Sequence, residues 1–191
     1  KKNFYQRLAF DEIFSTFLVN SEIRKKIKKI KKKRKNLDKT KQNEIIDKLE
    51  FTLTKDQKKT LEEINNDLSS TNKMFRLLQG DVGSGKTIVS LIAAYNTINS
   101  GFQVAVMAPT EILARQHYNF AKKLFSKKVN VELISGKSEY KTKKEILKKL
   151  ANNEIDIIFG THAIFQKKVN FNNLGLIIID EQHKFGVNQR K

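Results

Sequence analysis

The first residues in this sequence that can do chemistry lie in a glycine-rich loop. Residues 80–87 read GDVGSGKT and match the pattern GxxxxGKT in full, directly after an apolar run. Glycines at these positions let the chain wrap so tightly that successive backbone N–H groups point at an anion. A helix that begins here adds the positive end of its dipole. The residues expected to hold a nucleotide are Gly80, Gly83, Ser84, Gly85, Lys86 and Thr87.

Two side chains in this loop would act directly on a nucleoside triphosphate. The ammonium of Lys86 can reach the β- and γ-phosphates, and the hydroxyl of Thr87 can ligate magnesium. A glycine-rich turn with an incidental lysine is the simpler alternative, but the strand and helix patterns on either side of the loop favour a phosphate site. A dinucleotide fold is disfavoured because position 88 is isoleucine where that pattern needs a third glycine.

An acidic pair follows a second apolar run. Residues 176–179 read LIII, and Asp180 and Glu181 come directly after them. A buried strand that ends in carboxylates places them at the carboxyl edge of a sheet, where the glycine-rich loop is also expected. Asp180 could hold magnesium and Glu181 could polarise the water that attacks the γ-phosphate, whereas a solvated strand cap is the structural alternative. The three histidines lack the spacing of metal ligands, so no structural zinc is expected.

The elements that would position these motifs follow from the hydrophobic pattern. Strands are expected at residues 74–78, 104–108, 129–134, 155–159 and 176–179. Helices are expected at residues 55–67, 86–99, 111–125 and 139–151, where apolar positions lie three or four apart. Short apolar runs that alternate with amphipathic stretches are typical of βαβ units. The sequence therefore predicts an α/β fold with a doubly wound parallel sheet and a ligand site beyond the carboxyl ends of its strands.

The start of the chain has a different pattern. Apolar residues recur at helical spacing between many lysines over residues 4–35, which predicts one long helix. Its basic tract at residues 24–35 could follow phosphates or form a solvated helix face. The polar stretch after it suggests a boundary, so residues 1–48 are interpreted as an N-terminal helical linker segment and residues 49–191 as the nucleotide-binding domain.

Charge and composition narrow the class of partner. The chain has 191 residues with 38 Lys and Arg against 20 Asp and Glu, a formal net charge of +18. Such an excess favours a polyanionic partner, nucleic acid first, although a lysine-rich proteome would also produce it. The absence of cysteine excludes disulfides and thiolate metal sites. No apolar run approaches the roughly 20 residues of a bilayer span, so we expect a cytoplasmic protein with no membrane partner.

Six strings of this sequence resemble the motifs of one family. They are LAFDEIF, FTLTKDQ, RLLQGDVGSGKT, VAVMAPTEILARQH, GTHAIFQ and IIIDEQHKFGVNQR. In order and spacing they resemble RecG-type DNA helicases of superfamily 2, over nearly the whole chain. The resemblance implies a RecA-like P-loop NTPase domain, a parallel sheet flanked by helices, preceded by an N-terminal helical segment. It also implies ATP and Mg²⁺ as cofactors and branched double-stranded DNA as partner.

The resemblance also assigns roles to single residues. In FTLTKDQ, it implies that Gln57 reads the adenine base while Phe51 packs nearby. Thr54 and Gln57 also have the spacing of a helix capping box, and both roles are compatible. Likewise Thr110 could serve only as a helix N-cap.

Further positions resemble the family's nucleic-acid-binding loops and the residues that couple its nucleotide site to its nucleic-acid site. The implied nucleic-acid-binding residues are Pro109, Thr110, Glu111, Ser135, Gly136, Gly160, Thr161 and His162. The implied coupling residues are Gln182, His183, Gln189 and Arg190, although simple packing beneath the loop is the alternative for Gln182 and His183.

Two departures limit the transfer from the family. Lys184 stands where the family usually has arginine, so a forked contact there becomes a point charge. The chain also stops at Lys191, so the second RecA-like domain and the wedge domain are expected elsewhere in the intact protein, and the fragment alone should turn ATP over poorly.

The expected function is an ATP-dependent DNA helicase that regresses forks and migrates Holliday junctions in repair and recombination. Two alternatives stay open at this point. One is a translocase that couples transcription to repair, which has the same motor layout. The other is a basic module that binds nucleotide or DNA without turnover.

Overall fold

Three helices come first along the described part of the chain, and strands and helices alternate after them. The computed structural model describes residues 14, 21, 33–136, 140–165 and 169–181. The helices are α2 (Lys39–Ile46), α3 (Lys55–Ser69), α4 (Lys86–Asn99), α5 (Glu111–Phe125) and α6 (Tyr140–Ala151), with the short 3₁₀ helices η1 (Ser126–Lys128) and η2 (His162–Phe165). The strands are β1 (Gln103–Met107), β2 (Val131–Ile134), β3 (Ile157–Gly160) and β4 (Leu174–Ile179). None of the helices in the described ranges combines the length and the hydropathy of a transmembrane span.

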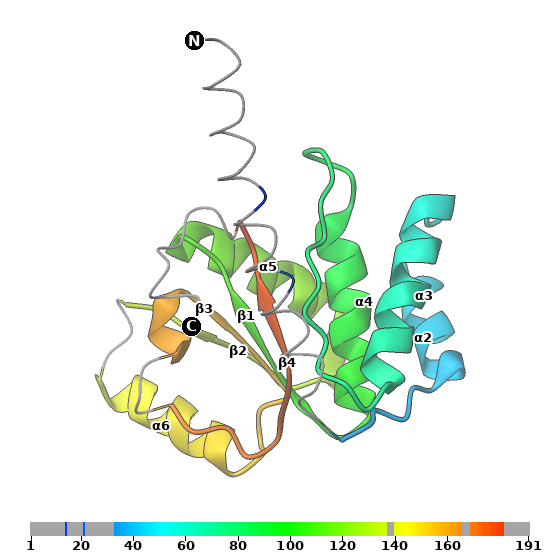
Figure 1. Ribbon diagram of the computed structural model, residues 1–191. Helices are drawn as coiled ribbons and strands as arrows, with labels where there is room; N and C mark the ends of the chain where they lie inside the picture. Colours follow the sequence, from blue (N-terminus) through cyan, green and yellow to red (C-terminus); the bar gives the residue numbers. More distant parts are fainter. Residues whose placement is uncertain (1–13, 15–20, 22–32, 137–139, 166–168, 182–191) are drawn as a thin grey trace, which may run out of the picture.

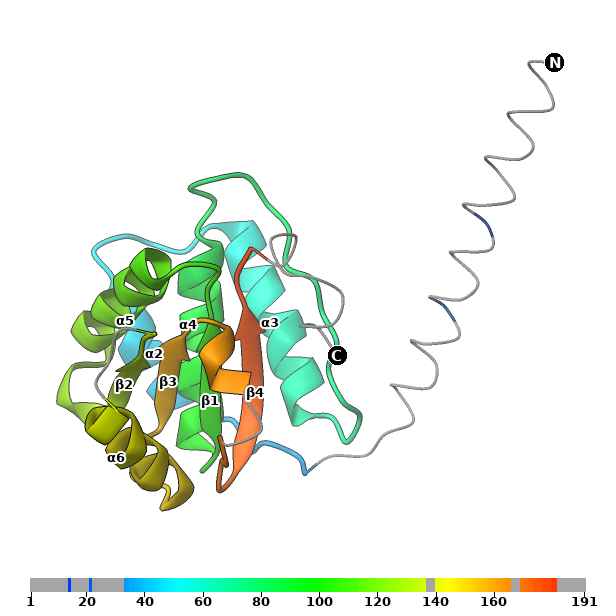
Figure 2. The same cartoon turned by 90° about the vertical axis from the view of Figure 1, so that its left-hand side faces the viewer.

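The four strands form one parallel sheet in the order β2-β3-β1-β4, which Figure 2 shows as a row. Val104 of β1 pairs with Ile157 of β3, and Ala105 pairs with Ile177 of β4. Because all strands run the same way, their carboxyl ends meet at one edge of the sheet. The predicted parallel α/β sheet is confirmed, and so are the four predicted helices to within two residues.

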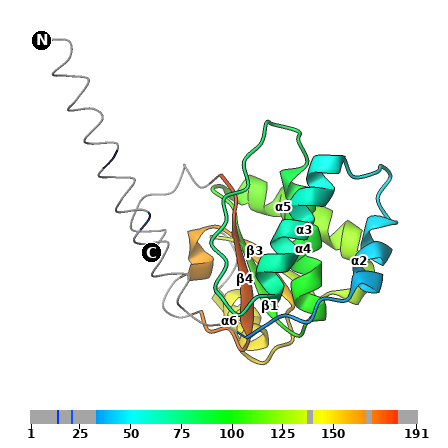
Figure 3. The same ribbon diagram turned by 45° about the vertical axis from the view of Figure 1, so that its right-hand side comes forward.

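Helices cover both faces of the sheet (Figures 1 and 3). Alternate strand residues face opposite sides. Val104, Val106 and Phe159 pack into a core with α4 and α5, whereas Ala105 and Ile158 pack into a second core with α6 and η2. Helix α3 lies on the outer side of α4, so α4 is enclosed and its residues 91–97 are all buried.

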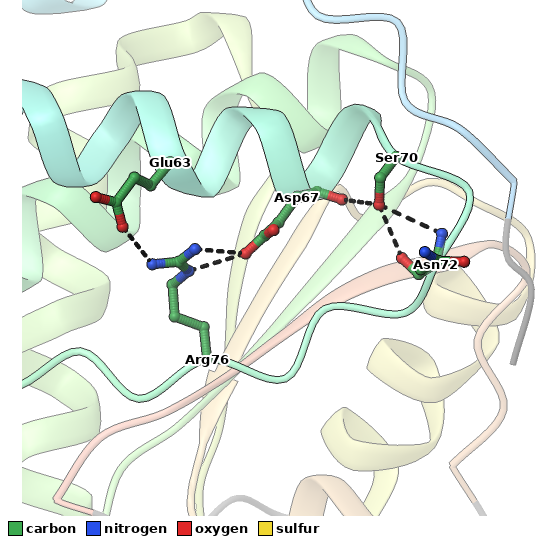
Figure 4. Close-up of polar contacts among 5 residues, drawn as sticks. All are labelled: Glu63, Asp67, Ser70, Asn72 and Arg76. Atoms are coloured by element: carbon green, nitrogen blue, oxygen red, sulfur yellow. Dashed lines mark hydrogen bonds and ion pairs between the residues drawn. The ribbon is translucent and has the colours of Figure 1, made fainter. Parts of the chain in front are cut away.

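The strand predicted at residues 74–78 is wrong, because the structure assigns no strand there. Met74 and Leu78 pack against the first core, but Phe75 and Leu77 are 76% and 72% exposed. Between them, Arg76 forms ion pairs with two carboxylates of α3 (Figure 4), at 2.7 Å to Glu63 and 2.8 Å to Asp67. The apolar run therefore packs only in part, and the segment is held by side chains on α3 and not by a strand ladder.

Part of the predicted N-terminal linker packs onto the domain. Ile45 of α2 is 1% exposed and belongs to the same core as α4. A partly buried polar network joins three helices, because the Asn96 amide donates to Gln42 at 2.7 Å and to Asn65 at 2.9 Å. Helix α2 thus contributes to this core, and the division at residues 48 and 49 stays a prediction.

The predicted long helix falls mostly outside the described residues. Phe14 and Ser21 are helical, but residues 33–38 are not, so the helix does not extend to Lys35 as predicted. The ammonium of Lys35 lies over the ring of Phe102, 4.9 Å from its centroid, which anchors this segment beside the start of β1.

We predict that Gln103→Leu destabilises the fold by about 3 kcal/mol. The Gln103 side chain is 1% exposed, and its Nε2 donates to the carbonyls of Leu150 and Ile155 at 2.9 Å each. Its Oε1 accepts from the N–H groups of Asn172 and Asn173 at 2.9 and 3.0 Å. Leucine has similar size but leaves these buried backbone groups without that partner. Urea unfolding followed by circular dichroism measures the loss.

The control for this prediction is Gln116→Leu, at an exposed position of α5. It should change the free energy of unfolding by no more than about 0.5 kcal/mol. Equal midpoints for the two variants would show that the Gln103 hydrogen bonds contribute little to stability.

Candidate nucleotide and nucleic-acid site

The glycine-rich loop joins the segment before it to α4. Gly85 is the N-cap of α4 and has φ +81°, and Gly83 has φ +81° as well. This left-handed backbone strongly favours glycine. A Cβ atom at Gly85 would also collide with the side-chain amide of Gln57. Two of the loop's glycines are therefore required by its backbone, as the sequence pattern indicated.

Lys86 turns back into this loop. Its Nζ donates to the carbonyl oxygens of Gly80 and Asp81 at 2.6 Å each, and the side chain is half-buried. The first residue of α4 thus directs a positive charge into the turn of the loop. Thr87 follows on the same first turn of the helix and is also half-buried.

Gln57 contacts the loop from the first turn of α3. Its Nε2 donates to the Ser84 carbonyl at 2.9 Å. Its Oε1 accepts from the Thr54 N–H at 2.9 Å, and the Thr54 hydroxyl accepts from the Gln57 N–H at 3.2 Å, which completes the predicted capping box. The cap and the loop therefore share one side chain. Phe51 is 53% exposed on the segment before α3.

Asp180 lies at the end of β4, beside the end of β1. Its backbone N–H donates to the Met107 carbonyl at 2.8 Å, and its Oδ2 lies 2.8 Å from Nε2 of His117. The hydrogen bond from His117 is the main cause that lowers the pKa of the Asp180 carboxyl, and burial opposes it. The charge of Lys86 lowers this pKa further. The lowered pKa keeps the Asp180 carboxyl ionised at neutral pH.

Glu181 leaves the sheet directly after Asp180. Its φ of +50° is uncommon for a residue with a side chain and turns the chain out of β4. The residue is exposed. The carboxylate therefore stands beyond the strand end and apart from the core.

His117 is a site residue that the sequence interpretation missed. It lies on α5, and its side chain is only 15% exposed, against 33% for Asp180. The available signal was its spacing, because Ala114, His117, Tyr118 and Ala121 recur three or four residues apart on the inner side of α5. Spacing alone could not show that this face reaches the acidic pair, 63 residues away in the chain.

The predicted nucleic-acid loops follow three neighbouring strands. Residues 109–111 come after β1, residues 135–136 come after β2 and residues 160–162 begin with the last residue of β3, so they share one edge of the sheet. The Thr110 hydroxyl accepts from the Leu113 N–H at 3.2 Å and so caps α5, as one reading expected. Pro109 is half-buried, and His162 is exposed.

Within these loops, the side chains divide by exposure. Ser135 and Thr161 are 5% and 8% exposed, so contacts from these two residues to an external ligand would fall to backbone groups. The Glu111 carboxylate accepts from the Gly136 N–H and joins two loops. A Cβ atom at Gly160 would lie 2.6 Å from the Ile134 carbonyl, so this glycine permits close packing of β2 and β3. The predicted coupling residues Gln182, His183, Gln189 and Arg190 lie outside the described residues.

The parallel α/β fold and the motifs at the carboxyl edge of its sheet define the class of protein. The family model described as DEAD/DEAH box helicase matches residues 54–191, and the chain belongs to that family. Its sequence is 47% identical over 189 residues to the ATP-dependent DNA helicase RecG of Aquifex aeolicus, and 46% identical over 187 residues to that of Thermotoga maritima. These matches cover 98% and 97% of this chain but 24% of each relative. The chain therefore spans about a quarter of the length of these relatives.

Comparison with solved structures gives the same family. A structure described as RecG bound to a three-way DNA junction superposes with a TM-score of 0.86 and 45% identity, over 95% of this chain and 25% of that one. The UvsW helicase of bacteriophage T4 superposes with a TM-score of 0.56 at 21% identity and supports the fold alone. The predicted RecA-like fold and the resemblance to RecG are thus confirmed.

Proposed function

We propose that the protein carrying this chain is an ATP-dependent DNA helicase that acts on branched DNA, and that this chain is its first nucleotide-binding motor domain. The observation that carries the proposal is the geometry of the glycine-rich loop, in which Gly83 and Gly85 have a left-handed backbone and the ammonium of Lys86 turns into the loop at the start of α4. Similarity to RecG supports the choice of branched DNA, since the solved relative is bound to a three-way junction. Fork regression and Holliday-junction migration in repair and recombination are the processes that this activity would serve.

The residues at the edge fit ATP and magnesium. The loop offers backbone N–H groups and the ammonium of Lys86, which suit a triphosphate, and Gln57 lies against the same loop to meet the base. Phe51 is exposed nearby along the chain to pack on it. The Thr87 hydroxyl and the ionised Asp180 are oxygen ligands of the kind that magnesium prefers.

Each catalytic group has a separate task in this proposal. Lys86 stabilises negative charge on the transferred phosphoryl group. Glu181 accepts a proton from the attacking water, for which its exposed place beyond the strand end is suited. Magnesium, when bound, offsets the charge on the β- and γ-phosphates.

The three loops at residues 109–111, 135–136 and 160–162 form the proposed contact with DNA. Backbone N–H groups and the N-terminus of α5 suit phosphate oxygens, which carry no sequence information. Lys143 lies beside them, because its Nζ donates to the Gly136 carbonyl at 2.8 Å. The net charge of +18 supports the same partner.

The rest of the proposed machinery lies beyond the described residues. Gln182, His183, Gln189 and Arg190 would link the nucleotide state to the DNA contact. A second RecA-like domain would close over the nucleotide, and a wedge domain would meet the branch point. These partners are proposed because the relatives are about four times longer than this chain.

The proposal is tested by phosphate release from the full-length gene product. The assay compares a three-way junction, a linear duplex of equal length and no DNA, with gel analysis of the junction products. We expect the junction to stimulate release most and to be converted to migrated products. Equal stimulation by linear duplex would favour a transcription-coupled translocase, and no stimulated release would favour a binding module.

Adenine recognition has a test of its own. Gln57→Ala should reduce the preference for ATP over GTP, measured as the ratio of kcat/KM values, by about tenfold, because one polar contact to a base edge contributes roughly 1–2 kcal/mol. Thr54→Ala is the matched variant. It removes the hydroxyl of the cap at a cost of about 1 kcal/mol in stability and leaves the Gln57 amide in place.

The two variants separate the two roles of Gln57. If Thr54→Ala lost nucleotide preference as fully as Gln57→Ala, the cap would explain the effect and base recognition by Gln57 would be wrong.

A further inference from the structure

His117 contacts Asp180 in the candidate site, but the proposed reaction gives its side chain no task. We propose that His117 is a positioning residue, which holds the Asp180 carboxylate in the orientation that the magnesium site requires. The inference rests on the proposed function, because it concerns the metal site of the same reaction. It assigns to α5 a part in the nucleotide site in addition to its place beside the DNA loops.

The contact has the geometry of a strong hydrogen bond. Nε2 of His117 lies 2.8 Å from Oδ2 of Asp180. An ionised carboxylate can only accept, so Nε2 carries the proton and donates. A hydrogen bond to a charged acceptor is shorter and stronger than one between neutral groups, and a neutral imidazole suffices to make it.

The imidazole is itself held in place. The side chain of His117 is 15% exposed, on a helix that begins with a Thr110 cap and packs along β2 and β3. On the next residue, the Tyr118 ring packs edge-on against Phe159, with centroids 6.4 Å apart. The donor therefore belongs to a rigid element, whereas Asp180 is 33% exposed at the point where the chain leaves β4.

Because His117 is held more rigidly than Asp180, the hydrogen bond can fix the orientation of the Asp180 carboxylate. A half-exposed aspartate at a strand end samples several rotamers, and a metal that binds it must fix one of them. A hydrogen bond from a buried donor fixes the carboxylate beforehand. Groups that orient metal-binding carboxylates in this way typically contribute about 10-fold to 100-fold in metal affinity.

The alternative is a merely structural hydrogen bond, and magnesium-dependent nucleotide binding separates the two. The full-length gene product is titrated with a fluorescent N-methylanthraniloyl derivative of ADP, first in excess EDTA and then with increasing Mg²⁺. Three substitutions are compared. His117→Ala removes the donor, His117→Asn keeps a polar group that is too short to reach Oδ2, and His117→Gln keeps an N–H near the place of Nε2.

We expect His117→Ala and His117→Asn to bind the nucleotide in EDTA within about twofold of wild type. Both should need about 10-fold to 100-fold more Mg²⁺ for half-maximal magnesium-dependent binding. His117→Gln should restore the wild-type requirement to within about threefold. Asn119→Ala, at an exposed position on the same helix, is the matched control and should match wild type.

The readouts separate failure of this inference from failure of the proposed function. A wild-type protein that binds no nucleotide, or binds it without any effect of Mg²⁺, overturns the proposed function and this inference with it. A normal wild type, with His117→Ala and His117→Asn at its Mg²⁺ requirement, overturns the inference alone. So does a His117→Gln variant as impaired as His117→Ala. Melting in EDTA identifies an unfolded variant, and if His117→Ala unfolds, the comparison of His117→Asn with His117→Gln decides.

Discussion

Lys86→Ala is expected to reduce DNA-stimulated phosphate release by at least about 100-fold, the effect of removing one preorganised donor from a developing charge. The ammonium is directed into the glycine-rich loop by hydrogen bonds to the Gly80 and Asp81 carbonyls. Alanine keeps the helix and leaves the loop glycines unchanged, and it removes the ammonium together with its two hydrogen bonds to the loop. Malachite-green detection of phosphate from the full-length gene product, with and without a three-way junction, measures it.

A matched lysine separates this effect from a general loss of positive charge. Lys73 is exposed on the segment before the loop, and Lys73→Ala removes the same charge. We expect its stimulated rate to stay within about twofold of wild type. If Lys86→Ala retained stimulated release, the assignment of this loop to catalysis would be wrong.

The parts of the site that the sequence predicted are those encoded by local pattern. The glycines at positions 83 and 85 are needed because the backbone there is left-handed, and that requirement is visible in a single sequence. The acidic pair was placed correctly because a parallel sheet brings all carboxyl ends to one edge. The capping box of Thr54 and Gln57 likewise depends on residues three apart.

The parts that were missed depend on contacts between distant residues. His117 meets Asp180 across 63 positions, and Gln103 meets Asn172 across 69. The spacing of residues within one helix or strand does not reveal either of these distant partners. The wrong strand at residues 74–78 has the same cause, since this short apolar run shows no sign of the ion pairs between Arg76 and α3. A short apolar run fits a strand, but a strand also needs a pairing partner, which the run itself does not identify.

Glu181→Gln is expected to lower the rate of ATP hydrolysis while leaving the affinity for nucleotide nearly unchanged. The proposed task of Glu181 is to accept a proton from the attacking water, and an amide of the same size cannot do so. The substitution should lower the rate of ATP hydrolysis by about 100-fold to 10,000-fold. The affinity for nucleotide should stay within about twofold, because the amide fits the same exposed place beyond β4.

Single-turnover hydrolysis and equilibrium nucleotide binding, measured on the same full-length preparation, separate the two quantities. Glu62→Gln, at an exposed position of α3, makes the same chemical change away from the sheet edge and should leave both unchanged. A normal rate in Glu181→Gln would leave binding as the only activity assigned to this edge and would favour the binding module over the motor. A slow rate with intact affinity would instead place the chemical step at residue 181, because binding and hydrolysis would then depend on different groups of the same site.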